Sequence, residues 1–300
     1  MRITSEVMVN RSLDRLHNRL EAYERSQSEL ATGSKILRPS DDPTGARRSM
    51  SLSSAVRGQE QFLRNASDAR GWVENADTQL GSAANRLARA RELVVGAASN
   101  PEPEERTAVA TELREIAEEI AGIANTEHQG RPLFGGYTDG AAVEFDDATQ
   151  TWVANGGGDE VTRRVSDTEL VRVNTTAQEW MGFDADGTGG DDLLSYLEQL
   201  ATVVEQGSSE EISAELGNLD ARTEQLNAAR SQIGAATNRI NSAVDRAESL
   251  RLTLRTELSD VEDVDVAEGI MELQVQQVGY EATLQALSQA LPPSLMAFMR

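Results

Sequence analysis

Apolar side chains recur at alternating intervals of four and three residues near both ends of the 300-residue chain, and this spacing limits its fold more than any other feature. Such a heptad pattern is typical of helices that pack along their length against other helices. Near the C-terminus the pattern includes Val266, Ile270, Leu273, Tyr280, Leu284, Leu287 and Leu291. Near the N-terminus it includes Val9, Leu13, Leu16, Leu20, Tyr23 and Leu30. We call these sets the C-terminal seam and the N-terminal seam, and we predict that the two terminal helices pair.

The predicted terminal pair is marginal on its own. Seven buried apolar side chains on the C-terminal helix would stabilise it by ~10 to 20 kcal/mol, at ~1.5 to 3 kcal/mol each. Ordering the backbone costs ~1 to 2 kcal/mol per residue, which offsets a gain of that size over a helix of this length. We therefore expect both ends to order fully only in an assembly, with the two seams as assembly contacts.

The middle of the chain contains two more helical stretches. The heptad pattern between residues 55 and 99 is the cleanest in the sequence, and its many alanines permit close packing of helices. The sequence Asn100-Pro101-Glu102-Pro103 ends this stretch, and a second helix follows it, which predicts a helical hairpin. Helical spacing returns at residues 191–258 with one interruption at Gly207.

Residues 131–190 differ in character from the rest. They are rich in glycine and contain short β-prone pieces at residues 141–145, 151–154, 161–165 and 170–174. Pieces this short and few do not make a large sheet. We predict a small β-rich insertion at the far end of the helices.

The predicted fold is therefore mainly α. It is an elongated nested coiled-coil helical bundle formed by the N- and C-terminal halves, with a small β-rich insertion. A content of only 4% aromatic residues favours long helices packed with small and aliphatic side chains. The predicted domains are a terminal-helix assembly domain (1–42 and 259–300), a helical rod (43–130 and 191–258) and the β-rich outer domain (131–190).

Charge and composition exclude several classes of function. A net charge of −22 argues against a nucleic-acid surface, and no stretch is apolar enough for membrane insertion. The chain has no cysteine, so it has neither a disulfide framework nor a thiol nucleophile. The N-terminus lacks the apolar core of a cleaved secretory signal, so we expect either a cytoplasmic protein or one exported by another route.

No catalytic, cofactor or metal site is predicted. Residues 184–192 carry clustered Asp and Gly residues that suggest calcium, but Ser195 stands where a calcium-binding loop needs Glu, so we favour a turn before an acidic helix start. His17 and His128 have no spaced ligand partners, and we expect both at the surface. Gly156 to Gly158 lack the Lys-Ser/Thr ending of a phosphate loop, and we predict a hairpin tip there.

The connector after the first helix has the most distinctive sequence. It reads Leu-Ala-Thr-Gly-Ser-Lys-Ile-Leu-Arg-Pro-Ser-Asp-Asp-Pro-Thr-Gly over residues 30–45. Asp42 is a plausible N-cap with Pro43 at the first helical position. Together with Met-Arg-Ile-Thr at the start, Arg-Pro-Leu-Phe-Gly-Gly-Tyr at 131–137 and the end of the chain, this stretch resembles the flagellin superfamily, and within it the proteins that join hook to filament. The loop residues that carry the resemblance are Gly33, Pro39, Ser40, Asp41, Asp42 and Pro43.

The resemblance implies a structural function and not an enzyme. Members form an adaptor ring of identical copies that docks on hook-associated protein 1 and offers flagellin a surface on which the filament grows. Their terminal helices form the inner tube of the assembly. They leave the cell by type III export without a cleaved signal peptide, usually with a flagellar export chaperone, which implies a location in the extracellular flagellum. Pro292-Pro293 departs from the family, which normally continues its last helix there.

Two alternatives stay open at this point. The chain could be flagellin itself, the filament subunit, because the terminal helices are shared across the superfamily. It could also be a cytoplasmic coiled-coil adaptor, which fits every heptad stretch but leaves the 30–45 sequence without an explanation.

Overall fold

The computed structural model of the chain describes residues 2–99, 102–156, 158–184 and 186–290. This part is mainly helical, as predicted. Its helices are α1 (Arg2–Thr32), α2 (Pro43–Ser99), α3 (Pro103–Ala124), α4 (Ala177–Met181), α5 (Leu193–Gln206), α6 (Ser209–Glu262) and α7 (Val266–Ala290). Its strands are β1 (Glu127–His128), β2 (Arg131–Pro132), β3 (Val143–Asp146), β4 (Thr151–Ala154), β5 (Thr162–Arg164) and β6 (Leu170–Arg172). None of these helices combines the length and the apolar character needed to cross a membrane.

The chain divides into two compact units. Unit 1 contains Met1–Gly58 and Leu250–Arg300, and unit 2 contains Gln59–Ser249. Both divisions fall inside the long helices α2 and α6 and not at the ends of elements. The predicted limits of the terminal, rod and outer domains lie elsewhere, and they stay a prediction.

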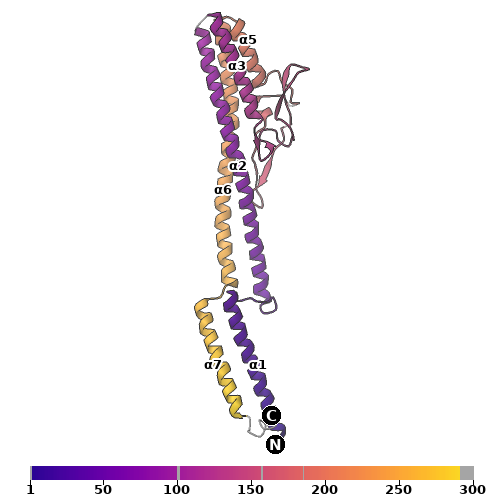
Figure 1. Cartoon of the computed structure of the whole chain (residues 1–300), viewed down its shortest axis with the longest axis vertical. Helices are drawn as coiled ribbons and strands as arrows, with labels where there is room; N and C mark the ends of the chain where they lie inside the picture. Colours follow the sequence, from indigo (N-terminus) through magenta and orange to yellow (C-terminus); the bar gives the residue numbers. More distant parts are fainter. Residues whose placement is uncertain (1, 100–101, 157, 185, 291–300) are drawn as a thin grey trace. The chain divides into compact units, whose positions relative to one another are not determined.

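In unit 1, α1 and α7 lie side by side (Figure 1). The predicted pairing of the two terminal helices is therefore confirmed. In unit 2, α3 packs along α5. Ion pairs join α2 to both of its neighbours, with Arg89 reaching Glu112 of α3 at 2.9 Å and Arg91 reaching Asp220 of α6 at 2.8 Å. The predicted hairpin of α2 and α3 is confirmed as well.

Unit 2 has a continuous apolar core that follows the predicted heptad positions. Along α2 the buried positions repeat at intervals of four and three, with small side chains alternating with larger ones. They are Ala66, Ala69, Val73, Ala76, Leu80, Ala83, Leu87, Ala90, Val94 and Ala97. On α6 the buried apolar residues include Ile212, Leu219, Leu226, Ile233 and Ile240. The regular alternation explains how long helices stay in close contact over many turns.

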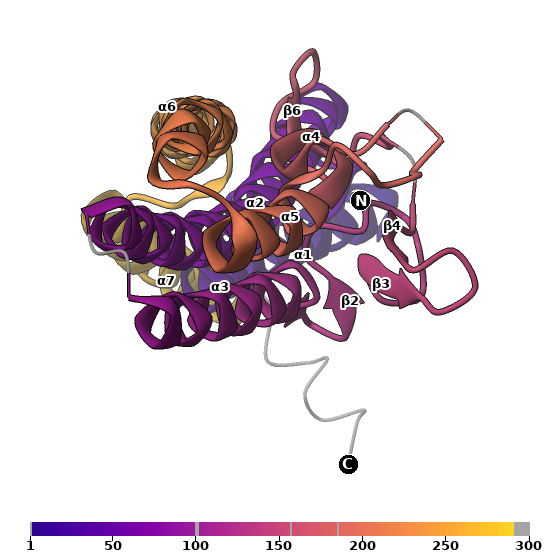
Figure 2. The same ribbon diagram turned by 90° about the horizontal axis from the view of Figure 1, so that it is seen from above.

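The β-rich part consists of three separate antiparallel pairs, β1–β2, β3–β4 and β5–β6. The four predicted pieces are confirmed as β3 to β6 with small shifts at their ends. The pair β1–β2 and the short helix α4 were not predicted. Figure 2 shows β3 and β4 beside α3 and α5, with which they are in contact.

The expected place of the insertion at the far end of the helices is wrong, because polar contacts hold it along their sides. Arg163 of β5 pairs with Asp68 of α2 at 2.8 Å. Glu169, in the turn between β5 and β6, accepts from Arg239 and Arg246 of α6 at 3.4 and 2.7 Å. The hairpin β5–β6 is thus attached to both long helices.

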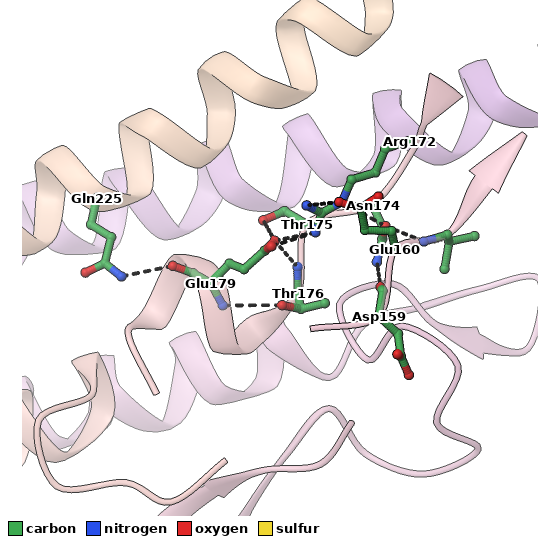
Figure 3. Close-up of polar contacts among 9 residues, drawn as sticks. Asp159, Glu160, Arg172, Asn174, Thr175, Thr176, Glu179 and Gln225 are labelled. Atoms are coloured by element: carbon green, nitrogen blue, oxygen red, sulfur yellow. Dashed lines mark hydrogen bonds and ion pairs between the residues drawn. The ribbon is translucent and has the colours of Figure 1, made fainter. Parts of the chain in front are cut away.

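A second set of polar contacts fixes α4 against β6 and α6 (Figure 3). Thr176 and Glu179 form a capping box at the start of α4, in which each side chain bonds the backbone of the other residue. Arg172 of β6 pairs with the Glu179 carboxylate, and Gln225 of α6 donates to the Glu179 carbonyl at 2.9 Å. Asn174, which is buried, accepts from the Val161 N–H at 2.8 Å. The short helix α4 is therefore held by contacts from β6 and α6, which the sequence around α4 does not predict.

Candidate assembly interface

The contact between α1 and α7 is made by a mixture of large and small side chains. Tyr23 and Tyr280 stack with their ring centroids 6.5 Å apart. Arg19 Nη1 donates to Gln276 Oε1 at 3.3 Å. A side chain added at Gly269 would come within 2.8 Å of Leu30, so this glycine lets α7 approach α1 closely. Among the residues that the structure describes, this aromatic stack, this hydrogen bond and close packing at a glycine contribute to holding the pair together.

The side of α7 that faces α1 carries few large apolar side chains. The half-buried positions there follow the heptad spacing and are Gly269, Leu273, Gln276, Tyr280, Thr283 and Leu287. On α1 the corresponding half-buried or buried residues are Ser12, Leu16, Leu20, Tyr23, Ser26 and Leu30. Several of these residues are polar or lack a side chain, so the pair buries less apolar surface than the predicted seams contain.

Some residues of the predicted seams are half-buried between α1 and α7, and others are exposed to solvent. Leu273, Tyr280 and Leu287 of the C-terminal seam lie half-buried, together with Leu16, Leu20, Tyr23 and Leu30 of the N-terminal seam. Val266, Ile270 and Leu284 are exposed, and so is Leu13. Leu291 and the side chain of Val9 lie outside the described residues. The actual contact side of α7 is thus rotated away from the predicted one.

A large apolar surface on α7 is left uncovered. It consists of Val266, Ile270, Met271, Val275, Val278 and Leu284, with exposed fractions from 39% to 65%. We call this set the apolar surface of α7. Sequence reasoning missed Met271, Val275 and Val278, although they too recur at intervals of four and three, on a second side of the helix. Burying each such side chain is worth ~1.5 to 3 kcal/mol, so the surface favours contact with a partner.

A groove runs beside this surface between α1 and α7. Many of its side chains are small, which leaves space for side chains from another helix. The lining residues are Ser12, Arg15, Asn18, Arg19, Ala22, Gln276, Ala282, Thr283, Ala286 and Leu287. Nearer the connector the groove becomes charged, with Arg25 and Lys35 opposite Asp265, Glu268 and Glu272.

Within unit 1, the connector motif after α1 is hydrogen-bonded to the segment between α6 and α7. Gly33 has a φ of +73°, a conformation that suits glycine, and ends α1. Its carbonyl accepts from the Val264 N–H at 3.0 Å, while the Lys35 N–H donates to the Glu262 carbonyl at 2.7 Å. The connection between α1 and α2 is thereby bonded to the connection between α6 and α7.

The rest of the motif forms the start of α2. Asp42 Oδ1 accepts from the Thr44 N–H at 3.0 Å and Pro43 is the first helical residue, as predicted. Asp41 accepts from the Arg38 N–H at 3.1 Å. Pro39 and Ser40 are exposed in the turn between them. The motif therefore acts locally as a capped turn that sets where α2 begins.

The acidic stretch at residues 184–192 serves as turn and helix cap. Asp192 is buried, and its Oδ1 accepts from the N–H groups of Leu194 and Ser195 at the start of α5. Hydrogen bonds from the Thr188 hydroxyl and N–H lower the pKa of the Asp186 carboxyl. Asp191 pairs with Arg222. Within the residues that the structure describes, no group of three His, Cys, Asp or Glu side chains is arranged to hold a metal ion.

The two histidines differ. His17 is exposed on α1, as predicted. The prediction of a surface position for His128 is wrong, because its ring packs edge to face on Trp72 with centroids 5.4 Å apart. Its Nδ1 atom lies 3.3 Å from the Asn75 amide nitrogen. His128 thus belongs to the packing between β1 and α2.

Comparison with known families matches most of the helical part of the chain. Residues 3–139 match the bacterial flagellin N-terminal helical region, and residues 216–298 match the bacterial flagellin C-terminal helical region. The two matched regions contain α1, α2, α3 and α7 and most of α6. Residues 140–215, which include most of the β-rich part, lie outside both matches.

Individual relatives agree with the family match. The chain is 27% identical over 181 residues to "Flagellar hook-associated protein 3" of Salmonella typhimurium, covering 60% of this chain and 56% of that protein. It is 30% identical over 140 residues to "Flagellin" of Bacillus subtilis, covering 45% and 46%. The aligned part thus spans about half the length of these curated relatives. Among solved structures, FlgL from Xanthomonas campestris has the same fold, with a TM-score of 0.60, 17% identity and coverage of 69% of this chain and 99% of that one.

Proposed function

Because this chain belongs to the flagellin superfamily, we propose that it is a structural protein of the bacterial flagellum that joins the hook to the filament. The names of its relatives support a place in the flagellum, and the relative named as a hook-associated protein supports a position at the hook. No enzymatic role is part of the proposal.

The apolar surface of α7 is the observation that carries the proposal. Six large apolar side chains stay exposed on a helix whose other side already packs on α1. A helix with large apolar side chains exposed on two sides favours an environment in which neighbouring helices cover them. An assembly of several chains provides such neighbours, whereas an isolated chain does not.

In this proposal, some residues of the two seams form contacts within one chain and others form contacts between subunits. Leu273, Tyr280 and Leu287 pair with Leu16, Leu20, Tyr23 and Leu30 within one chain. Val266, Ile270 and Leu284, together with Leu13, contact other subunits. The groove beside α7 receives side chains from such a neighbour. Since surface and groove differ, the contact between copies is heterologous, which is the type that builds rings and tubes.

The mechanism is that of an adaptor. Copies of the chain form a ring, one side of which binds hook-associated protein 1 while the other offers the packing surface that flagellin recognises. The connector motif, with Gly33, Pro39, Ser40, Asp41, Asp42 and Pro43, sets the turn between the assembled helices and α2. Export to the extracellular flagellum without a cleaved signal peptide, with an export chaperone, completes the proposal.

Flagellin itself is the second candidate. The 30% identity to the Bacillus subtilis flagellin supports it, because the terminal helical regions are common to both kinds of protein. A filament subunit adds to its own growing end without limit, whereas a junction subunit forms one ring and stops. The two candidates therefore differ in what cells lose when the gene is absent.

Electron microscopy of cells that lack the gene, with an immunoblot for flagellin in the medium, tests the proposal. Bare hooks together with flagellin shed into the medium are the expected result. Filaments of normal length would refute the junction role. Absence of both filament and flagellin would favour the second candidate. Restoring the gene on a plasmid is the control, and it must restore filaments.

A further inference from the structure

The formal charge of the chain is concentrated in one of its two units. Unit 1 contains 13 Lys and Arg residues and 15 Asp and Glu residues, which gives a formal charge of −2. Unit 2 contains 15 Arg residues and 35 Asp and Glu residues, which gives −20. The unit with the exposed apolar helix is thus almost neutral, and nearly all of the excess negative charge lies on the other unit.

The arginines of unit 2 largely neutralise carboxylates of the same unit. Ion pairs within unit 2 involve Arg86, Arg89, Arg91, Arg114, Arg163, Arg172, Arg222, Arg230, Arg239 and Arg246. Few cations therefore remain to attract the carboxylates of another copy. The remaining excess is carried by exposed acidic side chains, such as Glu104, Glu115 and Glu118 along one side of α3.

From this partition we propose that unit 2 opposes self-association, so that charge repulsion between copies balances the attraction between their α7 surfaces. The inference rests on the proposed association of copies through unit 1. Since α2 and α6 continue from unit 1 into unit 2, association of two copies through α7 also brings their negatively charged unit 2 regions nearer to each other. A large net charge keeps proteins apart by such repulsion.

Repulsion of this kind depends on salt, whereas apolar contact is not screened. The Debye length is about 30 Å at 0.01 M salt and about 8 Å at 0.15 M. Free chains in dilute salt therefore stay apart despite the apolar surface of α7. Salt, or an acidic pH near the isoelectric point of about 4.5, weakens the repulsion and permits association.

Sedimentation velocity of the full chain over a series of NaCl concentrations at pH 7 tests the inference. The wild type is expected to change from monomer to oligomer as NaCl rises. The triple variant Glu104→Gln, Glu115→Gln, Glu118→Gln is expected to change at a lower NaCl concentration. The charge-preserving triple variant Glu104→Asp, Glu115→Asp, Glu118→Asp is the matched control, and it should change where the wild type does.

Every other outcome contradicts either the inference of charge repulsion or the proposed association through α7. Association that does not depend on NaCl, or that weakens as NaCl rises, overturns the inference and leaves the proposed function intact. An identical shift in the Gln and Asp variants overturns it too, because salt would then act on apolar contact alone. If neither the wild type nor the Gln variant associates at any salt concentration, the proposed association through α7 fails and the inference with it.

Discussion

The Nη2 atom of Arg172 lies 2.7 and 2.6 Å from the two carboxylate oxygens of Glu179. The same carboxylate accepts from the Thr176 N–H and the Thr175 hydroxyl, both at 3.2 Å. One acidic side chain therefore ties β6 to α4 and caps α4 at the same time.

Replacing this carboxylate should weaken unit 2. Glu179→Ala removes charged hydrogen bonds and half of a capping box, and should lower the free energy of unfolding by about 1 to 3 kcal/mol. Glu160→Gln is the control, because Glu160 pairs with the same arginine at 3.4 Å but is 62% exposed, and its loss should cost at most about 1 kcal/mol. Urea unfolding followed by tryptophan fluorescence measures both. Equal losses would mean that Glu179 is only another surface partner of Arg172.

The buried cap of α5 gives a second prediction. Asp192→Ala leaves the N–H groups of Leu194 and Ser195 without their acceptor and should cost about 1 to 2 kcal/mol of stability. Asp192→Asn keeps an acceptor oxygen in the same place and should cost less. Thermal unfolding followed by circular dichroism compares the two variants. A larger loss for Asn than for Ala would contradict the role as a cap.

A charge on the apolar surface of α7 should abolish assembly and leave the chain folded. Val275→Asp puts a carboxylate where the proposal places a neighbouring subunit, and burying an unpaired charge is costly. In the free chain Val275 is exposed, so helicity should not change. Val275→Leu keeps the surface apolar and should assemble. Motility in soft agar and circular dichroism of the purified chains measure the two effects. Normal motility of the Asp variant would remove Val275 from the interface.

Two glycines of α7 should respond in opposite ways to a side chain. Gly269→Val places atoms against Leu30 and Val264, both within 3.0 Å of the first added carbon, and should loosen the pair with α1 by about 1 to 3 kcal/mol. At Gly279 the nearest atom is an Arg19 nitrogen at 3.7 Å, so Gly279→Ala should gain about 0.5 to 1 kcal/mol of helix stability. Thermal loss of helicity distinguishes them. A gain for both would show that α7 does not depend on close approach to α1.

The start of α6 should make stability depend on pH. The Ser208 N–H donates to Glu211 Oε2 at 2.7 Å, and this bond lowers the pKa of the Glu211 carboxyl below its ordinary 4.5. A carboxyl whose pKa is lower in the folded chain stabilises it above the unfolded pKa. The contribution is lost as pH falls through the lower, folded value.

Acid titration of the helix start tests this sign. Glu211→Gln should flatten the pH dependence of stability below about pH 4.5. The carboxyl resonance of Glu211 followed by NMR gives its pKa directly. A midpoint above 4.5 would contradict the hydrogen bond as its cause.

The helices could be predicted from the sequence because heptad spacing and proline positions are local signals. Pro101 and Pro103 limit where α2 and α3 meet, and Pro43 starts α2. The contact side of α7 could not be predicted in the same way. That helix has apolar residues on two sides, and a count of apolar spacing ignores the glycine at 269, which lets α7 approach α1 closely.

The helix α4 and the position of His128 could not be predicted, because both depend on contacts with residues distant in sequence. Ala177–Met181 is too short to show a helical period, and the bond from Gln225 that supports it comes from another helix. His128 lies in β1 shortly after α3, where nothing local indicates the Trp72 ring against which it packs. The half-buried position of His128 is recognised only when the partner helix is known.

The hydrogen bonds from Lys35 to Glu262 and from Val264 to Gly33 couple two stretches of chain more than 200 residues apart. An insertion between Thr32 and Lys35 would break the alignment of this pairing unless the stretch from Glu262 to Val264 changed in step. An insertion between residues 36 and 40 would leave it intact. The length of the chain can therefore vary after Lys35. Before Lys35, a change in length requires a matching change between Glu262 and Val264.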